Sequence, residues 1–210
     1  MPPDLTHAHQ HLARSDRHMA ALIERFGPCQ LGRRKRDPFH VLATSIIGQQ
    51  LSSKAADTIQ KRVEAAAGCT SGTLRPEHLL GLEPDALRAC GLSNAKSRWL
   101  RAISQDAQDG TLDFRKLRRM DDETAIRTLD ALPGVGRWTA EMFLIFALNR
   151  LDIFSMGDVG LRNALQRLYN KGKTLDDAPT LALTARWAPY RSVASWYLWR
   201  LTDGDVQTWV

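Results

Sequence analysis

The stretch "LPGVGRWTAEM", residues 132–142, places a Pro-Gly-Val-Gly turn between an apolar leucine and the start of an apolar helix. Pro133 ends the preceding helix, because proline has no N–H to donate and its ring clashes with the helical backbone. Gly134 and Gly136 can both adopt a positive φ and expose their N–H groups, since neither carries a Cβ. A simple turn between helices needs one glycine at most, so the second glycine indicates a backbone that a ligand approaches closely.

The helix after this turn indicates which kind of ligand binds there. Because it begins near Arg137, its free N–H groups and the positive end of its dipole face the turn, which favours an anion. The pattern is typical of a helix-hairpin-helix motif, which binds phosphates of the DNA backbone. The alternatives are a helix C-cap with an incidental second glycine, and solvated surface charge at the basic side chains. We predict phosphate contacts from Gly134, Gly136, Arg137, Thr139 and, in the separate stretch "LSNAKSR", Lys96.

Helical periodicity continues in nearly every other segment, and we find no convincing strand pattern. The chain is therefore expected to be all-α, with short connections. Helix N-caps are expected at Asp37, at Ser52 or Ser53, at Ser93, at Asp121 or Asp122, and at Asp158. The expected helices lie near residues 11–26, 38–48, 53–67, 76–82, 84–89, 93–103, 122–132, 137–148, 158–168, 175–187 and 190–201.

Composition limits the class of protein. The chain has 210 residues, 43% hydrophobic and 25% charged, which is enough for one sizeable core or two small lobes. The longest apolar run, residues 142–148, is far shorter than the ~20 residues that a membrane span needs. The first residues, "MPPDLTHAHQ", contain no apolar leader. We therefore expect no membrane association and, in a bacterial source, a cytoplasmic location.

Charge and cysteine content narrow the class further. The net charge of +6, with basic runs at residues 33–36 and 115–119, suits a polyanionic partner, although a basic balance alone also serves solubility. Cys29, Cys69 and Cys90 are odd in number and widely spaced, without a CxxC pair. This spacing argues against a disulfide framework or a zinc knuckle and favours a reducing compartment.

Four stretches together carry a family resemblance. They are "DPFHVLATSIIGQQLSSKAA" (37–56), "CGLSNAKSRWL" (90–100), "LPGVGRWTAEMFLIFALNRLDIFSMGDVGLRNALQRLY" (132–169) and "WAPYRSVASWYLWR" (187–200). The chain resembles the helix-hairpin-helix DNA glycosylase superfamily, and within it the 3-methyladenine DNA glycosylase II family. The residues before Asp37 are too few for the N-terminal β-domain of some members, so the resemblance is to the compact form.

The resemblance implies a two-lobed helical DNA glycosylase fold with the active-site cleft between the lobes. We expect one module over residues 1–210, with lobe A at about 38–150 and lobe B at about 1–37 plus 151–210. Residues 1–34 are expected to pack beside the C-terminal helices and complete the second lobe.

The resemblance also implies a catalytic aspartate in the loop after the hairpin, where Asp158 stands in "SMGDVGL". The residues support this independently, because a carboxylate at a helix N-terminus is stabilised by the free N–H groups. Asp158 as a mere N-cap is the alternative. Asp152 is the competing acid, in a segment that reads as a loop leading to the site.

Position 138 bears on the chemistry. Superfamily members that also cut the DNA strand carry a lysine there, whose amine forms a Schiff base with the sugar. This chain has Trp138, and an indole cannot be that nucleophile. Water is therefore the expected nucleophile, and the enzyme is expected to be monofunctional and to leave an abasic site. Trp138, Met142 one helical turn later and, by resemblance, Tyr190 are candidates for an aromatic pocket around a cationic base, with core packing as the alternative.

A base inside a duplex must be flipped out before it is cleaved, and a wedge then fills the gap. In the family the wedge comes from the loop that matches "GQQLS". We predict Gln50, then Leu51, as the wedge, with Gln49 as structural support. A polar turn after a helix-ending glycine is the alternative.

No cofactor is expected. The iron–sulfur cluster of some relatives needs four cysteines after the aspartate, and no cysteine follows Cys90. A structural cation held by hairpin carbonyls is left open. His7, His9, His11 and His18 are interpreted as a solvated helix face, not as metal ligands, because no carboxylate or cysteine is spaced with them.

The leading hypothesis is a monofunctional glycosylase that excises alkylated purines, such as 3-methyladenine and 7-methylguanine, from double-stranded DNA as a monomer. One alternative is the same fold acting on another lesion, such as uracil or hypoxanthine. The other is a non-catalytic helix-hairpin-helix module that only binds DNA. A binding module needs neither an acid after the hairpin nor a wedge loop, so Asp158 discriminates between these classes.

Overall fold

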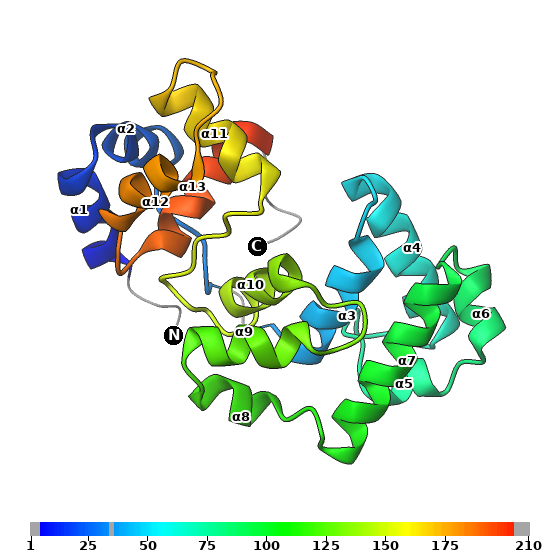
Figure 1. Ribbon diagram of the computed structural model, residues 1–210. Helices are drawn as coiled ribbons and strands as arrows, with labels where there is room; N and C mark the ends of the chain where they lie inside the picture. Colours follow the sequence, from blue (N-terminus) through cyan, green and yellow to red (C-terminus); the bar gives the residue numbers. More distant parts are fainter. Residues whose placement is uncertain (1–4, 34–35, 204–210) are drawn as a thin grey trace. The chain divides into compact units, whose positions relative to one another are not determined.

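The computed structural model describes residues 5–33 and 36–203, which form helices and no strand (Figure 1). This confirms the all-α prediction. None of the helices in this part of the chain is both long and apolar enough to cross a membrane. The helices are α1 (Thr6–Ser15), α2 (Arg17–Phe26), α3 (Pro38–Gly48), α4 (Ser53–Ala66), α5 (Pro76–Leu80), α6 (Pro84–Ala89), α7 (Asn94–Asp109), α8 (Phe114–Arg119), α9 (Asp122–Asp130), α10 (Arg137–Phe146), α11 (Val159–Tyr169), α12 (Asp177–Ala185) and α13 (Arg191–Asp203).

Capping side chains explain where several helices begin. Ser52, Ser93 and Asp121 each accept a backbone N–H from the first turn of α4, α7 and α9, respectively. The structure thus decides between the neighbouring candidates at two starts, with Ser52 the cap of α4 and Asp121 the cap of α9. Asp37 caps α3 through the N–H of His40, ahead of Pro38 at the first helical position.

The N-terminal segment differs from the single helix expected over residues 11–26. Asp16 is extended (φ −154°, ψ 118°) and separates α1 from α2. Its carboxylate accepts the N–H of His18 at 2.8 Å, and it also accepts the hydroxyl of Tyr169 at 2.9 Å and the indole N–H of Trp187 at 3.2 Å. The sequence did not indicate this break, because the apolar spacing continues across it. The break is stabilised by the buried carboxylate of Asp16, whose side-chain partners lie more than 150 residues away in sequence.

Helix α8 was not expected, because residues 115–119 were interpreted only as a basic run. Asp113 caps it by accepting the N–H groups of Arg115 and Lys116. Leu117 is buried, and the ring of Phe114 lies 5.8 Å from that of Phe143. The basic side chains therefore belong to the outer face of a short amphipathic helix.

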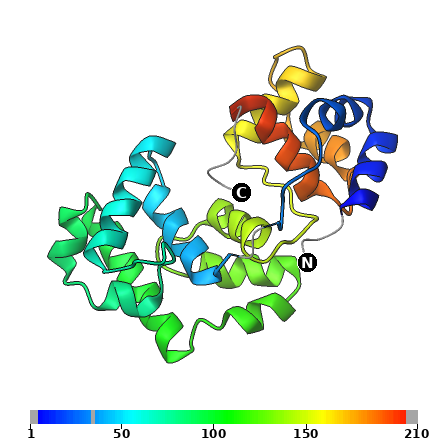
Figure 2. The ribbon, with the colours of Figure 1, turned by 180° about the vertical axis from the view of Figure 1, so that it is seen from behind.

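The described residues divide into two units. Unit 1 comprises those of Met1–Lys35 and Leu144–Val210, and unit 2 comprises those of Arg36–Phe143. The second boundary falls within α10, whereas the sequence placed it near residue 150. In unit 1, α1 and α2 lie beside α12 and α13 in both views (Figures 1 and 2), and α13 packs against α2 and α11. The N-terminal helices therefore share a core with the C-terminal ones.

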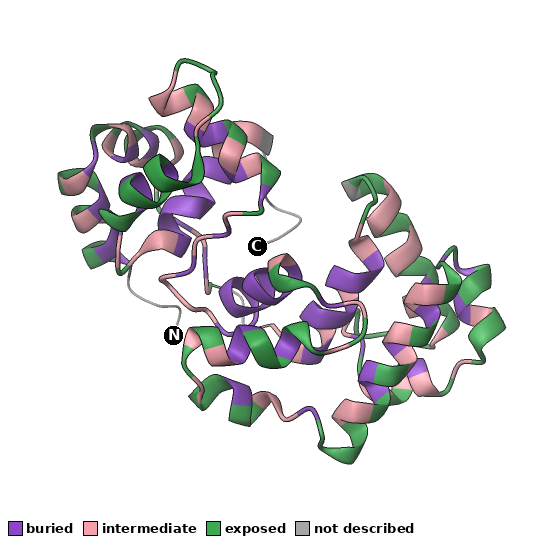
Figure 3. Ribbon diagram, viewed as in Figure 1, coloured by how far each residue is buried: buried purple, intermediate pink, exposed green. Residues whose placement is uncertain are grey.

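Each unit has its own buried core (Figure 3). In unit 1, Trp187 and Tyr197 are fully buried, together with Leu12 and Met19 of the N-terminal helices. In unit 2, the apolar residues of α3 are buried almost all round, and α3 packs against α4 and α7. Because complete burial of one large apolar side chain contributes about 1.5–3 kcal/mol, these cores fix the helices that carry the site.

His40 makes the stability of unit 2 depend on pH. Its Nδ1 accepts the backbone N–H of Leu74 at 3.1 Å, which requires a neutral ring. Burial lowers the pKa of His40 below its ordinary value, although Glu64 opposes this effect. The unfolded chain therefore binds a proton more readily than the folded one, and stability falls as the pH drops below the ordinary value of about 6.5.

We expect the urea midpoint of the wild type to fall more steeply than that of His40→Asn between about pH 7.5 and about pH 5. Asparagine offers Leu74 a side-chain oxygen that does not titrate in this range. Parallel pH profiles for the two proteins would contradict this assignment.

Candidate active site

The hairpin between α9 and α10 belongs to unit 2. Gly134 has a φ of +77°, and a Cβ there would overlap the ring of Trp99, with Cγ at 2.9 Å. Only glycine fits this position, because the backbone has a positive φ and because the ring of Trp99 leaves no room for a Cβ. Gly136 does not have a positive φ, so of the two glycines only Gly134 uses this freedom. Its carbonyl accepts the N–H of Ala140 at 3.0 Å in the first turn of α10, and a Cβ there would meet no atom within 4 Å.

Gln49 ties the hairpin to the end of α3. Its Nε2 donates to the carbonyl of Gly134 at 2.8 Å and to the hydroxyl of Thr139 at 3.2 Å. Thr139 is only 3% exposed, so its hydroxyl faces the protein and not a ligand. The hydroxyl of Thr139 is therefore not available to a phosphate. The backbone N–H of Thr139, in the first turn of α10, stays a candidate, because such groups lack an intrahelical acceptor.

Arg137 is engaged by two carboxylates. Its two terminal nitrogens donate to Glu123 at 3.0 and 2.9 Å, and its Nε donates to Glu141 at 3.0 Å. The hydrogen bonds to Glu123, with both negative charges, raise the pKa of the guanidinium above its ordinary value. A phosphate would have to compete with these carboxylates, so the structure does not support Arg137 as a phosphate ligand. It joins α9 to α10 instead.

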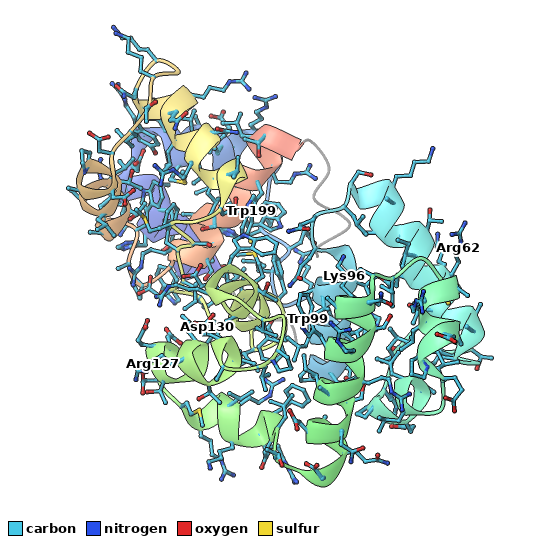
Figure 4. The ribbon with its side chains drawn as sticks, turned by 45° about the vertical axis from the view of Figure 1, so that its right-hand side comes forward. Arg62, Lys96, Trp99, Arg127, Asp130 and Trp199 are labelled. Atoms are coloured by element: carbon cyan, nitrogen blue, oxygen red, sulfur yellow. The ribbon has the colours of Figure 1, made fainter. Side chains whose placement is uncertain are left out.

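Lys96, on α7, caps the end of α3 (Figure 4). Its Nζ donates to the carbonyls of Ile47 at 2.8 Å and Gln49 at 2.6 Å. Partial burial lowers the pKa of the ammonium below its ordinary value. The structure therefore gives Lys96 a structural role, because a cation at the C-terminal end of a helix satisfies its free carbonyls and interacts favourably with its dipole. The phosphate contact of Lys96 stays a prediction.

The predicted wedge residues lie in the loop that these contacts hold. Gln50 is exposed and has a φ of +57°, and the following Leu51 is 38% exposed. A positive φ is uncommon for a residue other than glycine and persists where the flanking structure imposes it. Gln49 and Lys96 supply that support. Gln50 and Leu51 stay predicted wedge residues, and their exposure is compatible with that role.

In unit 1, Asp158 is the N-cap of α11. It is only 7% exposed, and its Oδ1 accepts the N–H of Leu161 at 2.8 Å and the indole N–H of Trp199 at 3.1 Å. Asp152 has a different environment. The guanidinium of Arg191 donates to both carboxylate oxygens of Asp152, at 2.8 and 2.9 Å. The backbone N–H of Arg191 also donates to Asp152, at 3.2 Å. Asp152 is therefore ion-paired with the first residue of α13, which leaves Asp158 as the candidate catalytic acid.

The three predicted pocket residues have different environments. Trp138 is half-buried on α10 in unit 2, and Met142, one turn later, is only 4% exposed. Such burial is that of a core residue. Tyr190, in unit 1, is half-buried, and its ring lies 5.5 Å from that of His11. Trp138 and Tyr190 are thus each partly accessible, and their part in a base pocket stays a prediction.

The N-terminal histidines are not a uniformly solvated face. His7 is exposed, but His9 accepts the backbone N–H of Cys29 at 3.2 Å. His18 packs its ring 4.7 Å from that of Tyr169. Among residues 5–33 and 36–203, no three histidine, cysteine or acidic side chains gather as metal ligands would. These rings serve packing within unit 1.

The comparison with protein families agrees with these features, which are a glycine hairpin, a loop anchored on it and a helix-capping aspartate. The model of the HhH-GPD superfamily of base excision DNA repair proteins matches residues 43–189, which is most of the chain. The chain belongs to this superfamily. The match includes the hairpin, the Gln49–Leu51 loop and Asp158, and it confirms the family inferred from the motifs.

Individual relatives of this HhH-GPD protein match it over nearly its whole length. DNA-3-methyladenine glycosylase 1 of Schizosaccharomyces pombe is 32% identical over 200 residues, covering 93% of this chain and 87% of the relative. The solved DNA-3-methyladenine glycosidase of Bacillus halodurans is 38% identical, with a TM-score of 0.80 over 96% of this chain and 91% of its own. The S. pombe 3-methyladenine DNA glycosylase Mag1, solved in complex with abasic DNA, has a TM-score of 0.83 at 31% identity and covers 94% and 97%, respectively.

The sequence gives no signal for the contacts of two further residues beside the candidate site. Trp99 packs on Gly134, and Trp199 donates to Asp158. Trp99 and Trp199 lie in helices that the sequence predicted, at positions where an aromatic residue is ordinarily interpreted as part of the core. Each contact joins elements at least 35 residues apart in sequence, so no local pattern indicates it.

The two interpretations of Lys96 predict different salt dependences of DNA binding. A lysine that contacts phosphate contributes about one unit to the slope of log K against log salt concentration. We expect Lys96→Met to leave this slope unchanged and to speed amide hydrogen exchange at residues 49–51, because two carbonyls lose their donor. Lys61→Met, which removes an exposed lysine from α4, is the charge control. A slope lowered by about one unit in Lys96→Met alone would restore the phosphate interpretation.

Proposed function

We propose that this protein is a monofunctional DNA glycosylase that excises alkylated purines of the 3-methyladenine and 7-methylguanine type from double-stranded DNA and so initiates base excision repair. The observation that carries the proposal is the carboxylate of Asp158, held at the start of α11 in a chain of the HhH-GPD superfamily. The names of relatives that match nearly the whole chain support the choice of substrate.

The chemistry assigns Asp158 an electrostatic role. Cleavage of the N-glycosidic bond leaves positive charge on the sugar, which a nearby carboxylate stabilises. The same carboxylate can orient or deprotonate the attacking water. A purine methylated at N3 or N7 already carries a positive charge and leaves readily, so its recognition needs electron-rich aromatic faces more than a strong acid. Trp138 and Tyr190 are the proposed faces.

Trp138 also supports the absence of lyase activity. A strand-cutting mechanism through a Schiff base needs a primary amine that attacks the sugar carbon. The indole of Trp138 has no such nucleophile, so water completes the reaction. The product is an abasic site in an intact strand.

The hairpin and the Gln49–Leu51 loop are proposed to hold the DNA. The N–H groups around Gly136 and the first turn of α10 bind a phosphate, and Gln50 or Leu51 fills the space of the flipped nucleotide. The proposed enzyme acts as a monomer and needs no metal or cofactor for the reaction. In a bacterial cell it acts in the cytoplasm, on chromosomal DNA.

Product analysis tests this proposal. The purified protein is incubated with methylated DNA, and the freed bases are identified by chromatography. We expect 3-methyladenine or 7-methylguanine, with strands that break only after alkali. Duplexes with uracil or hypoxanthine test the other lesions, and release from these alone would overturn the substrate assignment. DNA binding without release of any base would leave a binding module.

A further inference from the structure

Trp199 is a buried residue of α13 that contacts the candidate catalytic acid. Figure 4 labels Trp199. Its indole Nε1 donates to Oδ1 of Asp158 at 3.1 Å, and the two residues are 5% and 7% exposed. A hydrogen bond from a neutral donor to a charged acceptor in a water-poor site is stronger than a neutral pair. The indole thus fixes one oxygen of the carboxylate from a second helix.

The same oxygen accepts the capping hydrogen bond of α11. The N–H of Leu161 donates to Oδ1 at 2.8 Å, as expected of an N-cap aspartate. The capping hydrogen bond fixes the carboxylate to the start of its own helix, α11, whereas the hydrogen bond from Trp199 fixes it to α13. With both donors on Oδ1, rotation of the carboxylate about its side-chain bonds breaks at least one of them.

Gly160 leaves the space in which the carboxylate and the indole meet. A Cβ at this position would lie 3.2 Å from Oδ1 of Asp158, 3.5 Å from Cδ1 of Trp199 and 3.7 Å from Oγ1 of Thr202. The first of these distances is tighter than ordinary van der Waals contact. Gly160 lies in the first turn of α11 and is a poor helix former. Its contribution is therefore the room that it leaves for the carboxylate and the indole.

The indole itself is held by its neighbours. Its ring lies 5.7 Å from that of Phe146, tilted by 33°, and α13 packs along α11. Trp199 therefore has one position in the core and presents its N–H from a rigid support. A donor held in this way restricts the acid more than a flexible surface side chain would.

We propose that Trp199 is a positioning residue for the reaction, which holds the carboxylate of Asp158 in the orientation that stabilises the sugar cation. The inference rests on the proposed function, because it requires Asp158 to act on the sugar. In this role Trp199 acts through the acid, to which its indole donates. Its loss should therefore slow the chemical step without weakening the binding of DNA.

Helix α13 offers a matched control. Trp196 is also a buried tryptophan, 3% exposed, and its Nε1 has no hydrogen-bond partner in the part of the chain that the structure describes. Trp196→Phe and Trp199→Phe each remove an indole and leave an apolar ring. Only the second change removes a donor to Asp158.

The test measures single-turnover release of 7-methylguanine from a duplex, and separately the affinity for a duplex with a tetrahydrofuran abasic site. We expect Trp199→Phe to lower the release rate about 10- to 100-fold with unchanged affinity, since misplacement of a reacting group by 1 Å costs about that much. Trp196→Phe should release base at the wild-type rate. Thermal unfolding of both variants corrects for any loss of folded protein.

Gly160→Ala provides a variant that does not depend on removing a large ring. Alanine favours the helix over glycine by up to about 1 kcal/mol, so stability should be kept or raised while the new Cβ presses on the carboxylate and slows release. If the wild type releases no base, the proposed function fails. If the wild type is active and Trp199→Phe equals it, or both tryptophan variants slow release alike, the positioning role fails.

Discussion

Asp158→Asn is expected to lose base release by at least about 100-fold while the fold and the binding of DNA persist. Asparagine is as good an N-cap as aspartate, and its side-chain oxygen can accept the N–H of Leu161 and the indole N–H of Trp199. The substitution therefore removes the negative charge and keeps the geometry. Affinity for DNA should be unchanged or tighter, because one carboxylate no longer opposes the phosphates.

Asp152→Asn is the matched control for this prediction. It removes the other acid of the same loop region, whose charge Arg191 pairs at 2.8 and 2.9 Å. An amide oxygen can still accept the backbone N–H of Arg191, so α13 should keep its start. We expect release by Asp152→Asn to stay within a few-fold of the wild type. Full activity of Asp158→Asn, or equal loss in both variants, would remove Asp158 from the mechanism.

The features that the sequence predicted correctly depend on short stretches of chain. Helix starts at Asp37, Ser93 and Asp158 depend on a side chain that accepts an N–H three residues later, and that relation is visible in sequence. The need for glycine at position 134 was inferred from its turn, although the ring of Trp99 that also requires it was not. Local geometry therefore locates the elements and the acid.

The sequence did not predict the protein partners of the charged side chains. Lys96 and Arg137 look like phosphate ligands because each is basic and lies near a helix terminus. Their partners, two carbonyls of the α3 end and the carboxylates of Glu123 and Glu141, mostly come from other elements. The sequence shows that a side chain is basic but not which acceptor it binds. Whether that acceptor belongs to the protein or to a phosphate depends on the folded structure.

Gly134→Ala is expected to lower the free energy of unfolding of the protein by about 2–5 kcal/mol. The positive φ costs a residue with a Cβ about 1–2 kcal/mol, and overpacking against Trp99 costs about 1–3 kcal/mol more. The contact involves Cγ of Trp99, near the base of its side chain, so the whole ring has to move. Urea unfolding measures the loss, and DNA binding should fall with it, because the hairpin carbonyl that accepts from Gln49 is displaced.

Gly136→Ala separates the contribution of this glycine to DNA binding from its contribution to stability. Position 136 has no positive φ, and its Cβ would meet open space, so we expect the unfolding free energy to stay within about 0.5 kcal/mol of the wild type. A methyl group there would nevertheless stand where a phosphate approaches the N–H groups of the hairpin. Affinity for DNA should therefore fall about tenfold, the equivalent of ~1.4 kcal/mol. Unchanged affinity in a stable Gly136→Ala protein would show that no phosphate approaches the hairpin at this point, and the second glycine of the motif would then have no part in binding DNA.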